Sequence, residues 1–202
     1  MNLNPQQSNH MHQIIEKSIA ESIAVKQAIL ADDAFRQKIK QAAEMCIRTF
    51  RADGKVLFCG NGGSAADAQH ISAELSGRFY TDRPPLYAEA LHVNSSYITA
   101  VANDYGYDDV YARMVQAAGR PGDVLVAIST SGNSSNILKT IETAHNLNMT
   151  VIGMTGASGG KMCDLCDLLL NVPSTDTPRI QESHILIGHI MCQIIEREMF
   201  LE

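Results

Sequence analysis

Apolar and polar residues alternate along the chain with two different periods, and the order of these patterns predicts the fold. Between about residues 11 and 50 apolar residues recur at helical spacing, with an interruption near residues 31–33, so we expect two helices first. From residue 55 onward, short apolar runs predict strands at 55–60, 87–93, 123–129, 150–155 and 168–172. The stretches between them predict helices at 64–77, around 96–117, at 134–147 and at 178–200.

The arrangement of these elements can be inferred from the same pattern. The runs at 123–129 and 150–154 are apolar on both faces, as a parallel strand covered by helices on each side requires. Alternating strands and helices indicate an α/β protein with a doubly wound, parallel, five-stranded sheet, whose ligands bind at the carboxyl ends of the strands. We expect residues 1–54 to be an N-terminal helical segment that packs on the domain and in the oligomer, and residues 55–202 to form one unit.

Composition narrows the class of protein. With 202 residues, 45% of them hydrophobic, the chain can form one substantial core. A net charge of −6 argues against a general nucleic-acid binder, because such binding depends on Lys and Arg neutralising phosphates. No apolar run approaches the ~20 residues that cross a bilayer, and the first residues lack the features of a signal peptide. We therefore expect a cytoplasmic protein without a nucleic-acid or membrane partner.

The five cysteines do not indicate a disulfide framework. Their number is odd and their spacing irregular, so free, buried thiols are the expectation. Cys163 and Cys166 form a single C-x-x-C pair, whereas a structural zinc site normally needs four ligands. We expect neither a zinc nor a redox role for this pair.

Two turns after predicted strands suit an anion. The strand at 55–60 runs into Asn61, Gly62 and Gly63, and then into Ser64 as the expected N-cap of a helix, which aims free backbone N–H groups above the strand end. The glycine spacing does not match the dinucleotide fingerprint, and there is no Walker lysine.

The second turn follows the strand at 123–129 and carries a group of hydroxyl residues just before a helix. These are Ser129, Thr130, Ser131, Ser134 and Ser135. Hydroxyl and backbone donors that converge near a helix N-terminus favour phosphate binding, whereas an ordinary N-cap in a polar loop would need only one of the hydroxyls. The two turns together predict the walls of one pocket for a phosphorylated small molecule.

Candidate acid/base or metal-binding groups lie on two predicted helices. His70 and Glu74 are four residues apart and therefore neighbours on one helix face, although a pair of surface side chains is the simpler alternative. Such a pair can hold a divalent metal or divide acid and base work. Gln181 and His189 on the last helix are separated by roughly 12 Å, so they meet at one small ligand only if it lies between them or a second subunit supplies one of them. His184 faces away from His189, and we leave it out of the site.

The combination of motifs resembles the phosphoheptose isomerase family, the sedoheptulose 7-phosphate isomerases of the SIS fold. The matching segments are Cys59-Gly-Asn-Gly-Gly-Ser64, His70-x-x-x-Glu74, Ala102-Asn103-Asp104, Ile128-Ser-Thr-Ser-Gly-Asn-Ser134, and Arg179-Ile-Gln-Glu182 with His189. They follow one another in the family's order and span most of the chain. The resemblance implies a homotetramer that interconverts sedoheptulose 7-phosphate and D-glycero-D-manno-heptose 7-phosphate, a precursor of surface polysaccharide such as lipopolysaccharide.

The resemblance also implies roles for individual residues. The phosphate is expected at Ser129, Thr130, Ser131 and Ser134, and the sugar at Asn61, Gly62, Gly63, Glu74, Asn103, Asp104 and Gln181. Zinc, one ion per subunit, is expected at His70, Glu74, Gln181 and His189. Glu74 and His189 also match the family's proposed acid/base pair, and the two assignments compete because a metal-bound carboxylate or imidazole is a poorer proton acceptor.

Two other classes of protein remain as alternatives. A related SIS protein is a tetrameric scaffold for a replication initiator, but it lacks the residues matching Glu74 and His189, which are present here. A sugar-phosphate-sensing regulator would normally carry a DNA-binding domain, and the residues before the first strand show no helix-turn-helix signal. For the enzyme, a proton transfer through an enediol(ate) explains the need for a base, whereas a hydride shift does not.

Overall fold

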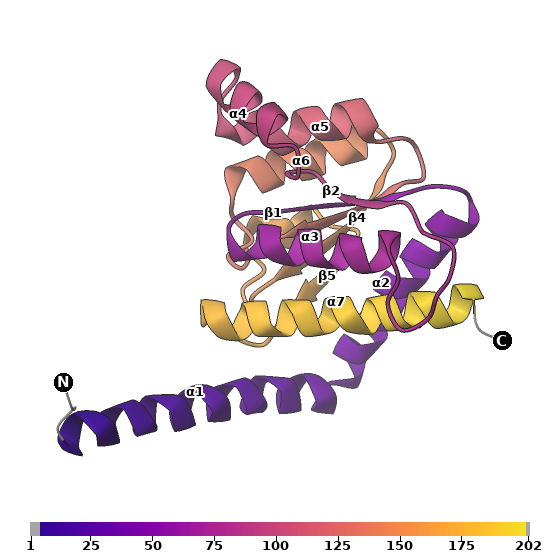
Figure 1. Cartoon of the computed structure of the whole chain (residues 1–202). Helices are drawn as coiled ribbons and strands as arrows, with labels where there is room; N and C mark the ends of the chain where they lie inside the picture. Colours follow the sequence, from indigo (N-terminus) through magenta and orange to yellow (C-terminus); the bar gives the residue numbers. More distant parts are fainter. Residues whose placement is uncertain (1–4, 201–202) are drawn as a thin grey trace.

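A computed structural model describes residues 5–200 (Figure 1). Its sheet has the five parallel strands that were predicted, and their order is β2-β1-β3-β4-β5. The strands are β1 (Val56–Gly60), β2 (Ala88–Ala90), β3 (Val124–Ile128), β4 (Thr150–Thr155) and β5 (Leu168–Asn171). Because β2 lies on one side of β1 and β3 on the other, the strand order reverses at β1, where ligands bind in a doubly wound sheet.

Helices cover both faces of the sheet (Figure 1). They are α1 (Pro5–Ala31), α2 (Asp33–Arg51), α3 (Gly63–Ser76), α4 (Ser95–Asp104), α5 (Val110–Ala118), α6 (Ser135–Asn146) and α7 (Thr177–Phe200). One apolar core lies beneath α2, α3 and α7, and a second lies beneath α4, α5 and α6. Alternate residues of β1 enter the two cores, with Phe58 in the first and Leu57 in the second, which explains why this strand is apolar throughout.

The predicted break between the first two helices falls at Asp32. Its carboxylate accepts a hydrogen bond of 3.0 Å from the backbone N–H of Phe35 and so caps the start of α2. The helical stretch around 96–117 is divided into α4, the short 3-10 helix Tyr107–Asp109 and α5, because Gly106 has a positive φ of 97°. A glycine inside an otherwise helical pattern therefore marks a real interruption here.

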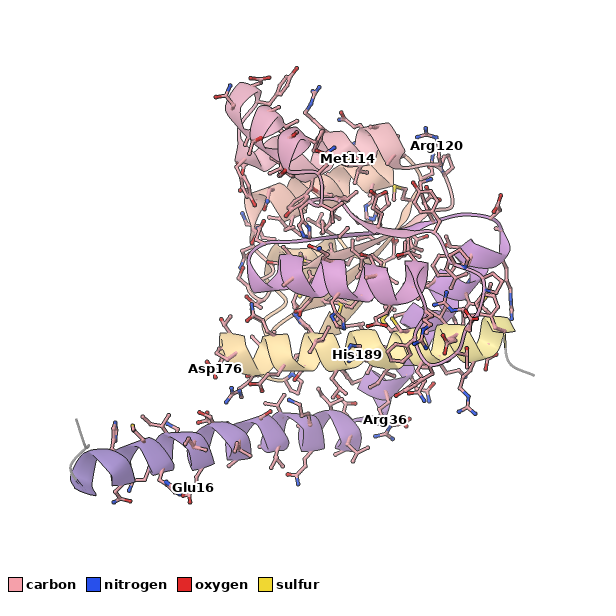
Figure 2. All side chains as sticks on the ribbon, viewed as in Figure 1. Glu16, Arg36, Met114, Arg120, Asp176 and His189 are labelled. Atoms are coloured by element: carbon pink, nitrogen blue, oxygen red, sulfur yellow. The ribbon has the colours of Figure 1, made fainter. Side chains whose placement is uncertain are left out.

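Helix α1 extends beyond the rest of the molecule, as Figures 1 and 2 show. It is joined to the start of α7 by polar contacts: Arg179 Nη1 donates to the carbonyl of Ser18 at 2.7 Å, and Ser22 Oγ donates to Glu182 at 2.7 Å. A row of its apolar side chains is exposed, namely Met11, Ile14, Ile15, Ile19 and Ile23. Most of this helix therefore does not pack on its own subunit.

The cysteines agree only in part with the sequence-based expectation. All five are free; Cys46, Cys59 and Cys192 are buried, Cys166 is half-buried and Cys163 is exposed. Cys163 lies in the short 3-10 helix Gly160–Asp164 before β5, outside the two cores, which is why its side chain reaches solvent. Among the described residues, no helix combines the length and apolar character needed to cross a membrane.

Candidate active site

The two expected anion-binding turns leave the sheet side by side. In the parallel pairing of β1 with β3, Gly60 lies opposite Ile128, so Asn61 and Ser129 emerge at the same edge. The amides of Asn61 and Asn136 exchange two hydrogen bonds of 2.9 Å, which tie the first turn to the start of α6. The two turns therefore lie next to each other, as the walls of one pocket would have to.

The first turn begins its helix one residue earlier than expected. Helix α3 starts at Gly63, and Gly62, not Ser64, is the N-cap residue. Gly62 has φ +55° and ψ −120°, a conformation that side chains rarely adopt, and it provides no side-chain cap. The predicted serine cap is therefore wrong, because the glycine reverses the chain before Ser64, which is buried inside the helix.

The serine loop of residues 129–134 brings three hydroxyl groups together. Ser129 Oγ lies 3.2 Å from Ser134 Oγ and 3.5 Å from Ser131 Oγ. Ser134 is the N-cap residue of α6, yet its side chain makes no capping hydrogen bond. The Ser134 hydroxyl therefore does not cap the helix, which was the alternative explanation for this loop, and it can bind a ligand. Gly132, with φ +65°, makes the bend of the loop possible.

Next to the serine loop is a hollow of about 270 Å³. Thr130 and Ser131 line it from the end of β3, Gly156 lines it from the end of β4, and Thr177 and Ile180 line it from the start of α7. The backbone of Gly156 donates a hydrogen bond of 2.9 Å to the carbonyl of Thr130, which fixes one wall to the other. The hollow has the polar lining and the adjacent helix N-terminus that suit a phosphate.

A second cluster of polar groups lies between α3 and α7. His70 Nε2 is 3.3 Å from Glu74 Oε1, as expected for residues four apart on one helix face. His189 from α7 completes the cluster, with its Nε2 3.0 Å from that of His70. One ligand atom from each of the three residues lies within 4.8 Å of the other two. The structure thus brings Glu74 and His189 together within one subunit.

A close approach of the two helices makes this meeting possible. Gly188, directly before His189, packs on Ile71, directly after His70, and any Cβ at position 188 would overlap the Ile71 side chain. Further toward the start of both helices, a Cβ on Gly63 would lie 2.5 Å from Nε2 of Gln181. Two glycines, one on each helix, therefore set the spacing at which the site residues face each other.

Some expected site residues lie apart from this cluster. The Gln181 amide lies against Gly63, and the hydrogen bonds of residues 5–200 include none between it and His70, Glu74 or His189. Asn103 and Asp104, at the end of α4, are exposed and bond to each other, with 2.8 Å between Asn103 Nδ2 and Asp104 Oδ1.

Comparison with known proteins identifies the family. A model described as SIS domain matches residues 17–156. The phosphoheptose isomerase of Rhodospirillum rubrum is 58% identical over 158 residues, 78% of this chain and 84% of that protein. That of Aneurinibacillus thermoaerophilus is 50% identical over 190 residues, 94% of this chain and 96% of that protein. The solved phosphoheptose isomerase of Neisseria gonorrhoeae matches with a TM-score of 0.87 and 46% identity over 92% of this chain and 98% of that one. The chain belongs to the phosphoheptose isomerases.

Membership of the phosphoheptose isomerase family decides between the classes considered from the sequence. The chain is an enzyme of the SIS fold, and the initiator-binding scaffold gains no support from these relatives. Glu74 and His189, the residues on which that distinction was based, lie in one cluster. In a phosphoheptose isomerase, a carboxylate and an imidazole this close can share the proton transfers of an isomerisation.

Two residues next to expected site residues were missed from the sequence. Asp67 lies one turn before His70, and its buried Oδ2 has no hydrogen-bond partner in the described structure. Burial raises the pKa of Asp67 to about 6, and the nearby His70 acts in the opposite direction. The three-residue spacing between Asp67 and His70 was the available signal. Tyr107, whose hydroxyl donates to Asn61 Oδ1 at 3.3 Å, left no such signal because the two residues are far apart in the sequence.

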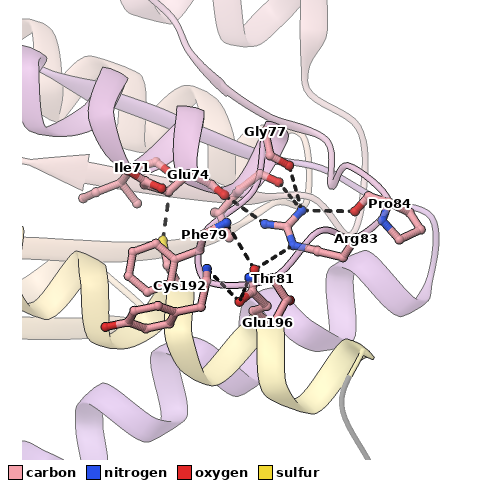
Figure 3. A network of polar contacts seen from close by, with 11 residues as sticks. Ile71, Glu74, Gly77, Phe79, Thr81, Arg83, Pro84, Cys192 and Glu196 are labelled. Atoms are coloured by element: carbon pink, nitrogen blue, oxygen red, sulfur yellow. Dashed lines mark hydrogen bonds and ion pairs between the residues drawn. The ribbon is translucent and has the colours of Figure 1, made fainter.

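A buried ion pair near the cluster was also missed. Arg83 Nε lies 3.2 Å from Glu196 Oε2, and both side chains are 2% exposed (Figure 3). Burial acts to raise the pKa of Glu196, but hydrogen bonds from the backbone N–H groups of Phe79, Tyr80 and Thr81 outweigh it, so the pKa lies below its usual value. Nothing in the sequence links Arg83 to Glu196, because the contact depends on the path of the irregular segment between α3 and β2.

Proposed function

We propose that this chain converts sedoheptulose 7-phosphate to D-glycero-D-manno-heptose 7-phosphate through an enediol(ate), and so supplies a heptose precursor. The observation that carries the proposal is the meeting of Glu74 and His189 in one cluster. It is supported by the resemblance of the whole chain to proteins named phosphoheptose isomerase. The substrate is a ketose with its carbonyl at C2, so the reaction moves that carbonyl to C1.

The proposed proton transfers use the two residues of the cluster in different roles. Glu74 removes a proton from C1, which is acidic because it lies next to the carbonyl, and the protonated Glu74 then delivers a proton to C2. His189 moves the proton between the two sugar oxygens as the double bond shifts. The Glu74 side chain is 27% exposed, so the cluster is open to a sugar. Hydrogen-bond donors near these oxygens stabilise the negative charge that develops.

We propose that the phosphate binds at the serine loop, through Ser129, Thr130, Ser131 and Ser134. Support comes from the hydroxyl groups gathered there and from the hollow that Thr130 and Ser131 line. Backbone N–H groups at the start of α6 add a modest attraction for the anion. The sugar chain would then contact Asn61, Gly62, Gly63, Asn103, Asp104 and Gln181.

The length of α7 bears on the size of the substrate. Ile180 lines the hollow beside the serine loop, and His189 is nine residues further along the same helix, or about 13 Å at 1.5 Å per residue. A seven-carbon sugar with a terminal phosphate comes much nearer to spanning this separation than a three-carbon one. The alternative, in which a second subunit supplies one end of the site, is compatible with the same phosphate and acid/base groups.

We further propose that the cluster holds one zinc ion. Two imidazole nitrogens and a carboxylate oxygen form a donor set that zinc favours. The 3.0 Å between the Nε2 atoms of His70 and His189 is close to the separation of two ligands on one tetrahedral zinc, about 3.4 Å for typical Zn–N bonds. His70, Glu74 and His189 would hold the ion through one atom each, which leaves the second carboxylate oxygen of Glu74 and the second ring nitrogen of His189 for proton transfer. Gln181, the proposed fourth ligand, lies against Gly63 and would have to turn toward the cluster to reach the ion. When bound, zinc supplies a Lewis acid that stabilises negative charge on a sugar oxygen.

One experiment tests the activity and the metal together. The purified protein is assayed with sedoheptulose 7-phosphate as isolated, after chelator treatment and after zinc is restored, with metal content measured on each sample. We expect interconversion with the aldose, loss on chelation and recovery with zinc. No turnover by the zinc-loaded protein would contradict the proposed function, whereas full activity of metal-free protein would contradict only the role of zinc.

We also propose that the protein is a homotetramer, as its resemblance to the phosphoheptose isomerase family implies, and a row of large apolar side chains exposed on α1 supports association between subunits. Met11, Ile14, Ile15, Ile19 and Ile23 are between 41% and 56% exposed, and an apolar patch of this kind typically marks a protein–protein interface. Light scattering should give a mass four times that of one chain. The double variant Ile15→Glu/Ile19→Glu should dissociate, whereas Gln13→Glu should not. A monomeric wild-type protein would contradict the proposal.

A further inference from the structure

The segment between α3 and β2, residues 77–87, has no regular secondary structure, yet Glu196 of α7 fixes its path. The carboxylate accepts hydrogen bonds from the backbone N–H groups of Phe79, Tyr80 and Thr81 at 3.2, 2.9 and 3.0 Å (Figure 3). A carboxylate that receives several backbone N–H groups holds them with charge-assisted hydrogen bonds. Phe79 and its neighbours are therefore attached to α7 by one buried side chain.

Arg83 attaches the same segment to the end of α3. Its Nε contacts Glu196, its Nη2 donates to the carbonyl of Glu74 at 2.9 Å, and its Nη1 donates to that of Leu75 at 2.8 Å. These carbonyls lie in the last turn of the helix, where backbone acceptors lack partners within the helix. Arg83 thus satisfies the end of the helix that carries Glu74 and joins it to α7 through Glu196 (Figure 3).

The contacts of Glu196 and Arg83 fix the position of the Phe79 ring. The ring stacks on the imidazole of His189, with 5.8 Å between the centroids and 26° between the planes. His70 makes a second ring contact, meeting the His189 ring edge-on with 5.0 Å between the centroids. The imidazole of His189 is therefore in contact with both an aromatic face and a second histidine.

We propose that Phe79 is a positioning residue that holds the His189 imidazole in its reactive orientation, and that Glu196 and Arg83 hold Phe79 in place. The proposal rests on the proposed isomerase function for its kinetic consequence, but the placement of the two rings is independent of it. Phe79 supplies no proton and no ligand atom. Its role is to restrict the rotation of a side chain whose misplacement by about 1 Å can cost ~100-fold in rate.

The test compares three substitutions in the full-length, zinc-loaded protein. Phe79→Leu removes the aromatic face, Phe79→Tyr keeps it, and Tyr87→Leu is a matched control that removes an exposed aromatic residue from the same segment. We expect Phe79→Leu to lower kcat by at least ~10-fold with KM for sedoheptulose 7-phosphate within twofold of wild type. Phe79→Tyr and Tyr87→Leu should retain wild-type kcat.

A second readout does not depend on catalysis. In protein labelled with ¹³C at histidine, an aromatic ring stacked on His189 shifts the imidazole resonances through its ring current, and His189→Asn assigns the signal. We expect Phe79→Leu to move this signal and Phe79→Tyr to leave it close to its wild-type position. Glu196→Gln, which keeps the shape of the carboxylate but removes its charge, should move it in the same direction as Phe79→Leu.

Several results would overturn the proposal. One is an unchanged kcat in Phe79→Leu, and another is an equal loss of kcat in Phe79→Leu and Phe79→Tyr. A third is a loss of kcat in Tyr87→Leu equal to that in Phe79→Leu, because it would indicate general destabilisation of the segment. An unmoved His189 signal in Phe79→Leu would overturn it as well. If the wild-type protein does not turn over sedoheptulose 7-phosphate, the proposed function fails, and the histidine signal alone decides whether Phe79 positions His189.

Discussion

Acidification from pH 7 to pH 5 should destabilise the folded protein through His184. This side chain belongs to α7 and is fully buried; its Nε2 donates to the carbonyl of Thr155 at 3.1 Å, and its Nδ1 has no partner in the described structure. A second proton would place an N–H at Nδ1 with no acceptor. Burial lowers the pKa of His184 from 6.5 to about 4, and the hydrogen bond to Thr155 acts in the opposite direction.

The folded protein loses stability as the pH falls because the unfolded state binds the proton at His184 first. Below pH 6.5 the unfolded chain takes up a proton at this histidine, whereas the folded protein does not until the pH nears 4. The unfolded state therefore gains stability as the pH falls, and the loss of folding free energy grows between these two values. At pH 5 proton uptake by the unfolded chain lowers the folding equilibrium constant by about 1.5 log units, which is a loss of about 2 kcal/mol in the free energy of unfolding.

Melting temperature measures this loss. For a chain of this length, about 2 kcal/mol corresponds to roughly 4–8 °C. Wild type and His184→Gln, whose amide can still donate to Thr155, are melted at pH 7 and pH 5 at one protein concentration. The fall in melting temperature between the two pH values should be smaller in His184→Gln by that amount. His145→Gln, which removes an exposed histidine, should keep the wild-type fall. An equal fall in wild type and His184→Gln would refute the reasoning.

The remaining predictions concern the site. Glu74→Gln and His189→Asn should each lower turnover of sedoheptulose 7-phosphate by at least ~100-fold, the usual scale for a positioned acid or base, while the circular dichroism spectrum and melting temperature stay near wild type. Ser131→Ala should chiefly raise KM, because the serine loop binds the phosphate. Initial rates at varied substrate concentration measure this KM. Gly63→Ala should lower kcat/KM by at least ~10-fold, because its Cβ would lie 2.5 Å from the Gln181 amide and displace it; kinetics with Ala65→Ser on the same helix is the matched control.

Each of these predictions has a result that contradicts it. Near-normal turnover in Glu74→Gln or His189→Asn would remove that residue from the acid/base pair. An unchanged KM in Ser131→Ala would show that this hydroxyl only shapes the loop. Wild-type kinetics in Gly63→Ala would show that the close approach to Gln181 has no bearing on catalysis.

Periodicity alone predicted the fold because the two strand faces are buried equally. Val126 enters the core beneath α7 while Leu125 enters the core beneath α6, so β3 is apolar throughout and is recognised as a central strand. Element ends were less predictable. The serine cap at Ser64 was wrong because the sequence does not reveal that Gly62 already reverses the chain. A glycine conformation is a property of the folded loop.

From local spacing alone the site was predictable only where its residues share a helix, whereas the pairing of Glu74 with His189 was predicted from the family resemblance. His70 and Glu74 are adjacent because of helical spacing, and the structure places them 3.3 Å apart. The arrival of His189 depends on the crossing at Gly188, which no local pattern reveals. Phe79 is hidden for the same reason, since its contact with His189 requires the buried pair of Arg83 and Glu196.

Solvent deuterium provides the most direct test of the central claim, that Glu74 removes a carbon-bound proton from a bound sugar phosphate. The purified, zinc-loaded protein converts sedoheptulose 7-phosphate in D₂O, and the aldose is examined by NMR and mass spectrometry. Glu74 is partly exposed, so the proton it removes can exchange with solvent. We predict deuterium at C2 of the aldose, and formation of both product and label at least ~100-fold slower with Glu74→Gln. Aldose formed at the normal rate with no deuterium at C2 would contradict the account.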